Sequence, residues 1–145
     1  MALTETVSFV ESKNAFGTAT LSGGSASFTT STRPAGTHPI KAVYGGDASF
    51  IGSTSKVVNQ VVSKATTTTT LASSRNPSNF GQSVTFTASV TPQFSGTVKG
   101  TVTFYHGAMA LKTMALSGGV PKFTTSTRTA GAHSITATYN GNANF

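Results

Sequence analysis

The chain has 145 residues, of which 37% are hydrophobic and only 9% charged, and it contains no cysteine. Its length and apolar fraction are those of a globular protein with one large core or two small ones, whereas the missing cysteines exclude disulfides, thiolate metal sites and thiol nucleophiles. Ten lysines and arginines against three acids give a net charge of +7, which raises the question of an anionic partner.

Short alternating segments, typical of β-strands, fill the first part of the chain. We predict strands at residues 6–10, 14–21, 25–31, 38–44 and 53–62. Two glycines in Ser22-Gly23-Gly24 predict a tight hairpin, because glycine readily adopts positive φ. From His38 to Tyr44, every second residue falls on one face, the mark of a half-buried strand.

The same pattern continues in the second part. The five threonines at 66–70 favour extended backbone, and we expect them to begin a strand. Further strands are predicted at 82–91, 101–105, 108–116, 120–126 and 133–139, with a hairpin at 117–119. The cleanest alternation is in 82–91, whose expected inward residues are Val84, Phe86, Ala88 and Val90. Short strands with frequent turn signals and no helical period predict an antiparallel sandwich.

The chain contains an internal repeat. Residues 6–50 match residues 101–145 without a gap at a constant offset of 95 residues, clearest in LSGGSASFTTSTRPAGTHPIKAVYGGDASF against LSGGVPKFTTSTRTAGAHSITATYNGNANF. A repeat of this length indicates two copies of one small domain. We predict domains at 1–62 and 63–145.

The shared Leu-Ser-Gly-Gly, Phe-Thr-Thr-Ser and Ala-Gly-x-His-x-Ile-x-Ala-x-Tyr segments resemble bacterial immunoglobulin-like repeats of surface and secreted proteins. The resemblance covers the chain from about residue 6 to residue 145. It implies seven-strand sandwiches, with strands A to G, that serve as spacers, stalks or adhesive modules outside the cell. The expected fold class is all-β: immunoglobulin-like antiparallel β-sandwiches in tandem, incomplete at both chain ends.

The incompleteness is specific. Copy one opens at strand C, whereas copy two begins at strand A and lacks the equivalent of 51–62, the last strand. Three explanations of the incomplete ends are open. The chain is a piece of a longer array, residues 51–62 complete residues 67–145 as a circularly permuted domain, or strands are exchanged between molecules. The candidate strand-exchange segment consists of Ile51, Val57, Val58, Val61 and Val62.

Residues with reactive side chains are few. His38 and His133 share one repeat position and are expected to bond a loop carbonyl, whereas His106, beside Gly107, is expected to be solvated. Three acids provide neither a catalytic carboxylate pair nor enough ligands for calcium. We therefore predict no enzyme, no catalytic or metal residue and no cofactor.

Other side chains are expected to be structural. Gly36 and Gly131 are expected at positive φ. The aromatic residues expected in the core are Phe9, Phe28, Phe86, Phe104 and Phe123, with Phe50 and Phe145 closing the sandwich ends.

The basic residues lie scattered along the chain, which favours an ordinary solvated surface over specific nucleic-acid binding. The alternative is a weak, salt-sensitive attraction to acidic cell-surface polymers. No apolar run could span a bilayer, and residues 1–4 lack the features of a signal peptide.

We expect an extracellular or bacterial cell-surface structural module, a spacer, stalk or fibre segment that associates with itself or with neighbouring repeats, without membrane insertion. The alternative is an adhesive module for a cell-surface glycan or anionic polymer. Decoration of a phage or virion stays open, because fold alone does not fix function.

Overall fold

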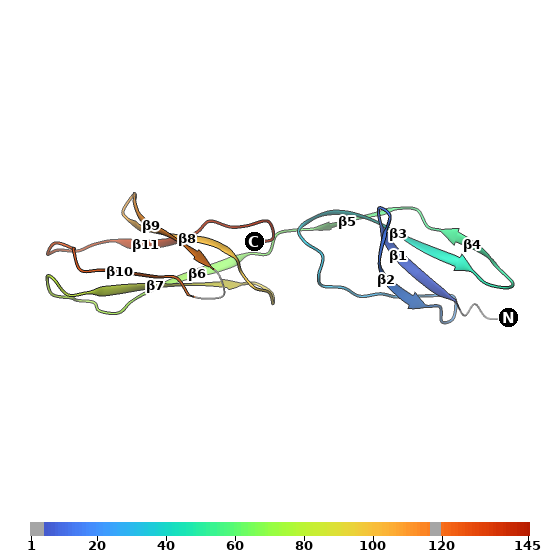
Figure 1. Cartoon of the computed structure of the whole chain (residues 1–145), viewed down its shortest axis with the longest axis horizontal. Coiled ribbons are helices and arrows are strands. Elements are labelled where there is room, and N and C mark those ends of the chain that lie inside the picture. Colours follow the sequence, from blue (N-terminus) through green and yellow to red (C-terminus); the bar gives the residue numbers. More distant parts are fainter. Residues whose placement is uncertain (1–4, 117–119) are drawn as a thin grey trace. The chain divides into compact units, whose positions relative to one another are not determined.

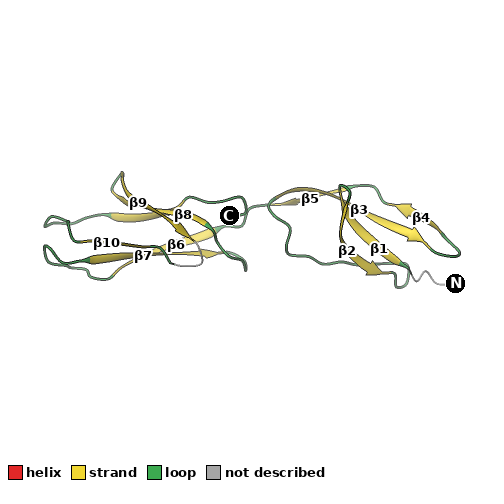
Figure 2. Cartoon of the chain, viewed as in Figure 1, coloured by secondary structure: helices red, strands yellow, loops and turns green. Residues whose placement is uncertain are grey.

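The computed structural model describes residues 5–116 and 120–145, and the chain divides into two compact units, Met1–Ser63 (unit 1) and Lys64–Phe145 (unit 2). All regular structure in the described residues is β-strand (Figures 1 and 2). The all-β, antiparallel class predicted from the sequence is therefore confirmed. The hairpin predicted at 117–119 and the signal-peptide question at residues 1–4 lie outside the described residues.

Within residues 5–116 and 120–145, no helix has the length and apolar character that crossing a bilayer requires.

Unit 1 is a single antiparallel sheet. Its strands are β1 (Thr6–Glu11), β2 (Asn14–Thr20), β3 (Gly36–Gly46), β4 (Ile51–Thr54) and β5 (Val58–Val62). The strand order is β2-β1-β3-β4, and β5 pairs with β3 as well, opposite its first residues. One edge of β3 is thus shared by two short strands, β5 and then β4.

The single strand predicted at 53–62 is wrong, because the segment is interrupted between β4 and β5. At the interruption, the amide of Ser55 donates to the carbonyl of Ala42, and the amide of Ala42 donates to Oγ of Ser55, each at 2.9 Å. The serine hydroxyl thus takes a place in the ladder that a backbone carbonyl would otherwise fill.

Unit 2 consists of two three-stranded antiparallel sheets. Its strands are β6 (Thr67–Ser73), β7 (Val84–Pro92), β8 (Gly100–His106), β9 (Met109–Leu116), β10 (Lys122–Thr125) and β11 (Ile135–Tyr139). One sheet has the order β10-β7-β6 and the other β11-β8-β9. This arrangement corresponds to strands E, B and A facing strands F, C and the strand after C of an immunoglobulin-like sandwich.

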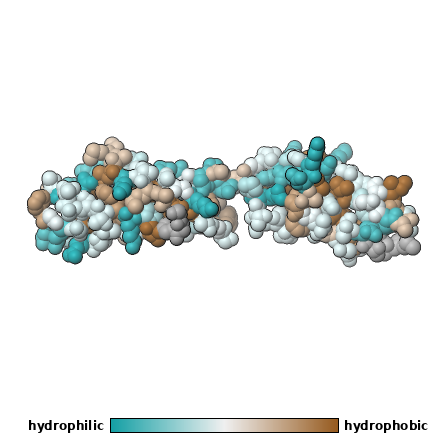
Figure 3. All heavy atoms as spheres, in the orientation of Figure 1, coloured by the Kyte–Doolittle hydropathy of each residue, from teal (hydrophilic) through white to brown (hydrophobic). Residues whose placement is uncertain are grey.

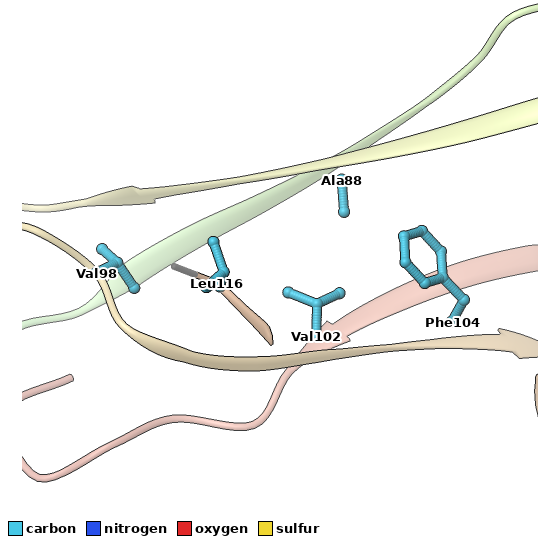
Figure 4. Close-up of a cluster of buried hydrophobic side chains, with 5 residues drawn as sticks. All are labelled: Ala88, Val98, Val102, Phe104 and Leu116. Carbon is cyan, nitrogen blue, oxygen red and sulfur yellow. The ribbon is translucent and has the colours of Figure 1, made fainter. Parts of the chain in front are cut away.

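The hydrophobic core lies between the two sheets of unit 2. Ala88 of β7 points toward Val102 and Phe104 of β8 (Figure 4), and all three side chains are fully buried. Phe86 and Val90 pack against this cluster, as the alternation along β7 predicted. None of the described apolar side chains of unit 1 is buried to this degree.

The strand predicted at 25–31 does not form, and only an isolated Ser22–Ser25 bridge remains at the Gly23-Gly24 turn. The matching residues of copy two, Lys122–Thr125, form β10 because they pair with β7, with Phe123 opposite Phe86. Unit 1 contains no described counterpart of β7. A strand needs a partner for its amides and carbonyls, so the same sequence pattern stays irregular there.

Phe28 shows the consequence for the aromatic residues. Its ring stacks on Phe9 and contacts Phe16 edge-on, each with centroids 5.9 Å apart, yet the residue remains 39% exposed. Placing Phe28 in a core was therefore wrong. Its counterpart Phe123 packs between Phe86 and Phe104 in unit 2.

Directly after the two positive-φ glycines, it is unit 1 that forms a strand and unit 2 that does not. Gly36 (φ 146°) and Gly131 (φ 130°) both adopt the expected conformation. Residues 36–40 belong to β3 because β5 pairs with them, whereas the matching residues 131–134 precede the start of β11. The strand predicted from His133 is shorter at its start for this reason.

A second turn is repeated more faithfully. Oδ1 of Asp47 accepts hydrogen bonds from the amides of Ser49 and Phe50, and Oδ1 of Asn142 accepts the two matching bonds in copy two. Burial, with the hydrogen bond to Asp47, raises the pKa of Tyr44 to about 12.

At the sandwich ends, Phe145 packs against the core of unit 2, but Phe50 is 44% exposed.

The surface reflects the scarcity of charge. Figure 3 shows mainly white spheres, the intermediate hydropathy of serine, threonine and glycine, interrupted by brown apolar and teal polar ones. The most exposed large apolar side chains are those of Ile51 and Phe80.

Candidate functional site

The corner after Gly36 in unit 1 carries a closed network of charged groups. Nε2 of His38 donates to the carbonyl of Pro34 at 2.8 Å, and Nδ1 lies 2.7 Å from Oε1 of Glu11. Nη1 of Arg33 donates to the other carboxylate oxygen at 2.5 Å. The carboxylate of Glu11 is thereby held between a histidine and an arginine.

Each partner changes the ionisation of the other. The hydrogen bond to the carbonyl of Pro34, with that to Glu11, raises the pKa of His38. The hydrogen bond from His38, with the nearby charge of Arg33, lowers the pKa of Glu11. Both ring nitrogens face acceptors, and only the protonated imidazole can donate from both, so this arrangement favours the cation.

The matching corner of unit 2 has the same histidine but a different partner. Nε2 of His133 contacts the carbonyl of Thr129 at 2.8 Å, so the expected carbonyl bond is confirmed in both copies. Nδ1 of His133 lies 3.3 Å from Nε2 of His106, which occupies the position of Glu11. His106, predicted to be solvated, is half-buried and in contact with His133.

The substitution at this position leaves Arg128, the counterpart of Arg33, without a carboxylate. Arg128 forms no ion pair with any described residue, whereas Arg33 pairs with Glu11. The buried Nε has no hydrogen-bond partner among the described residues in either arginine. Aligning the two copies shows the exchange of Glu11 for His106, but only the folded structure of unit 1 shows that Arg33 contacts this position.

Charge is divided unequally between the units. All three acids, Glu5, Glu11 and Asp47, lie in unit 1 beside four lysines and arginines, whereas unit 2 has six lysines and arginines and no acid. Within unit 2, a cation therefore has no side-chain carboxylate with which to pair.

A cleft of about 640 Å³ lies at one end of unit 2, between the loop after β6 and the loop after β10. Two arginines line it, Arg75 and Arg128, together with side-chain amides and the exposed ring of Phe80. The backbone amide of Asn79 donates to Oε1 of Gln82, and the backbone amide of Gln82 donates to the backbone carbonyl of Asn79. These two hydrogen bonds connect the ends of the turn in the first loop. Sequence reasoning missed this cleft, because Arg75 and Arg128 lie far apart along the chain.

The residues predicted for strand exchange lie on neighbouring short strands and the link between them. Ile51 belongs to β4 and is 95% exposed, while Val57 precedes β5. Val58 and Val61 of β5 are each more than 60% exposed, and Val62 ends the strand. The described pairing of β5 is to β3 alone, so its other edge is open.

Metal-ligating side chains do not gather in the described residues. No three histidine, cysteine, aspartate or glutamate side chains in that part of the chain are close enough to hold an ion. Such side chains meet only in pairs there, as Glu11 with His38 and His106 with His133.

Comparison with known proteins identifies the family. The family model of the bacterial Ig-like domain (group 3) matches residues 2–63 and again residues 67–145. No curated protein and no solved structure matches the chain. The two matches cover nearly the whole chain and agree with the antiparallel sheets of both units. The chain therefore belongs to the bacterial Ig-like domain (group 3) family, with one copy in each unit.

Proposed function

We propose that the chain is an extracellular structural module, a spacer, stalk or fibre segment, whose units associate through their open strand edges. Ig-like domain families are typically non-catalytic, and bacterial members are often found at the surface or outside the cell. The observation that carries the proposal is that each unit pairs a segment that the other leaves unpaired.

The pairing pattern indicates which edges would meet. In unit 1, β5 pairs with residues 36–40, whereas the matching residues 131–135 of unit 2 have no such neighbour among the described residues. An open edge presents unmatched amides and carbonyls to solvent, which favours association with another strand. The free edge of β5 in one chain would serve as the last strand beside β11 of a second chain.

This form of exchange keeps β5 on its own sheet. If β5 left β3 altogether, β3 would become as open as β11 had been, and the number of strand pairs would not increase. Pairing through the second edge of β5 adds a strand pair without removing one, so it lowers the free energy of the assembly.

Sedimentation velocity over a range of concentrations tests this assembly. We expect the chain to form oligomers or fibres, and Val58→Lys with Val61→Lys to abolish them, because charged side chains on an edge strand oppose strand pairing. Asn14→Lys with Thr18→Lys, which adds the same two charges at exposed positions of the opposite edge strand of unit 1, is the matched control. A chain that stays monomeric at its highest soluble concentration would contradict edge association.

A second candidate function is adhesion to an anionic cell-surface polymer or glycan. It is favoured by the six uncompensated cations of unit 2 and by the two arginines that line its cleft. A surface of one charge sign attracts polymers of the other sign, and this attraction weakens as salt is added.

A further inference from the structure

We propose that the cleft at the end of unit 2 binds the carboxylate of an acidic saccharide, a uronate, through Arg128 and Arg75. This inference rests on the second candidate function, adhesion, and assigns it a site and a ligand class. Unit 1 shows how an arginine at this repeat position holds a carboxylate. Unit 2 contains no acidic residue, so a carboxylate at the matching arginine must come from a ligand.

The template is the Arg33–Glu11 pair. In unit 1, the guanidinium of Arg33 holds a carboxylate that belongs to the chain itself. In unit 2, Arg128 occupies the same repeat position, but His106 has replaced the glutamate. Arg128 is thus placed as a carboxylate-binding arginine whose carboxylate is no longer part of the unit.

The charge of unit 2 makes this position unusual. Arg128 is only partly exposed, and its buried Nε, like that of Arg33, has no hydrogen-bond partner among the described residues. What distinguishes Arg128 is that it lacks the carboxylate with which Arg33 pairs. A guanidinium binds a carboxylate through two parallel hydrogen bonds, and this attraction is stronger in a cleft than on an open surface, because less water screens it. Arg75 lines the same cleft and adds a second positive charge.

The remaining lining favours a saccharide over an acidic peptide. Asn76, Asn79 and Gln82 supply amides and Thr125 and Thr129 supply hydroxyls, groups that suit a ligand rich in hydroxyls. Phe80 is 79% exposed, and an aromatic ring can pack against the apolar face of a sugar. The cleft volume lies within the range of small-ligand sites.

Calorimetric titration of the full chain with trigalacturonate tests the proposal. Arg128→Gln should weaken binding about tenfold or more, since hydrogen bonds to charged groups contribute about 1.5–3 kcal/mol. Arg75→Gln should also weaken it. Lys112→Gln removes the same charge from an exposed position of β9 outside the cleft and should change the affinity less than about twofold.

Two further probes define the ligand class. The methyl ester of trigalacturonate, which keeps the hydroxyls but not the charge, should bind much more weakly. Triglutamate carries the charge without the sugar and should also bind more weakly. Arg128→Lys keeps the positive charge but cannot form two parallel hydrogen bonds, so its affinity for trigalacturonate should be intermediate. Its thermal unfolding should match that of the parent chain, which would show that the loss of affinity is not a loss of folding.

Specific results would overturn the inference. If Lys112→Gln weakens trigalacturonate binding as much as Arg128→Gln does, the attraction is general, so adhesion survives while the cleft does not. Tighter binding of triglutamate would assign the cleft to acidic peptides. Absence of binding to all three probes at low salt would reject both the cleft and the adhesive function. Edge association is measured separately and is unaffected by these outcomes.

Discussion

A single repeat position separates the chemistry of the two units. Glu11 in unit 1 closes a network with His38 and Arg33, whereas His106 in unit 2 contacts the equivalent histidine and leaves the equivalent arginine unneutralised. The histidines themselves keep the same carbonyl bond in both copies. The histidine contact of this corner is thus the same in both units. The side chain at the position of Glu11 and His106 determines whether the neighbouring arginine has a carboxylate within its own unit.

The ion pair of Glu11 and His38 makes the stability of unit 1 depend on pH. The pKa of His38 is raised from 6.5, so its stabilisation is complete below 6.5 and disappears as the pH rises through the folded-state value. The pKa of Glu11 is lowered from 4.5, so its stabilisation is complete above 4.5 and disappears as the pH falls through the folded-state value. Both contributions are therefore complete between pH 4.5 and 6.5.

Glu11→Gln should accordingly destabilise unit 1 most in that window and less at alkaline pH, where His38 is neutral. Urea unfolding of the parent and variant chains at several pH values measures the difference. His106→Gln, the matched change in unit 2, should show no loss with this pH profile, because no acid is present there. A loss from Glu11→Gln that is the same at all pH values would contradict the ion-pair explanation.

Strand formation in this chain depends on partners as much as on local sequence. Residues 122–125 form β10 beside β7, while the matching residues 27–30 are irregular. Residues 36–40 extend β3 beside β5, while the matching residues 131–134 precede β11. Each difference follows the presence or absence of a neighbouring strand.

Supplying the partner should therefore convert 27–30 into a strand. When a second copy of residues 64–99 is fused before Glu5, its β7 segment should pair with 27–30 and place Phe86 opposite Phe28, as Phe86 lies opposite Phe123 in unit 2. Hydrogen exchange of the amides at 27–30 should slow, and the melting temperature of unit 1 should rise. The control is the same fusion with Phe86→Lys in the added copy, and equal protection in both fusions would contradict the pairing.

The two units should also differ in stability as wholes. Unit 2 has a buried apolar cluster between its sheets, including Val102 and Phe104, whereas no described apolar side chain of unit 1 is buried. Burial of apolar surface is the main favourable term in folding. The structure thus places most of that stabilisation in unit 2.

Thermal or urea unfolding of the chain should consequently show two transitions, with unit 1 unfolding first. Hydrogen exchange with mass spectrometry assigns each transition, because peptides from β1 to β5 should exchange faster than those from β7 and β8. Phe104→Ala should lower only the second transition, by about 3–5 kcal/mol. One cooperative transition for all peptides would show that the units do not unfold independently.

Much of the architecture could be predicted from the order of residues. The alternation along 82–91, the positive φ of Gly36 and Gly131, and the threonine strand at 67–73 follow from local sterics and side-chain periodicity, and the structure bears them out. The repeat indicated the family because both copies contain the Leu-Ser-Gly-Gly, Phe-Thr-Thr-Ser and Ala-Gly-x-His segments that carry the resemblance. These properties are local, so neighbouring residues suffice to specify them.

Other features required residues that are distant in the chain. The irregular 27–30 segment, the exposure of Phe28 and the break between β4 and β5 depend on which strands lie alongside. The contact of His106 with His133 and the lining of one cleft by Arg75 and Arg128 depend on loops brought together by folding. Hydrogen-bond partners and ion-pair neighbours are set by distance in space, and the amino-acid order alone does not contain that distance until the sheets have formed.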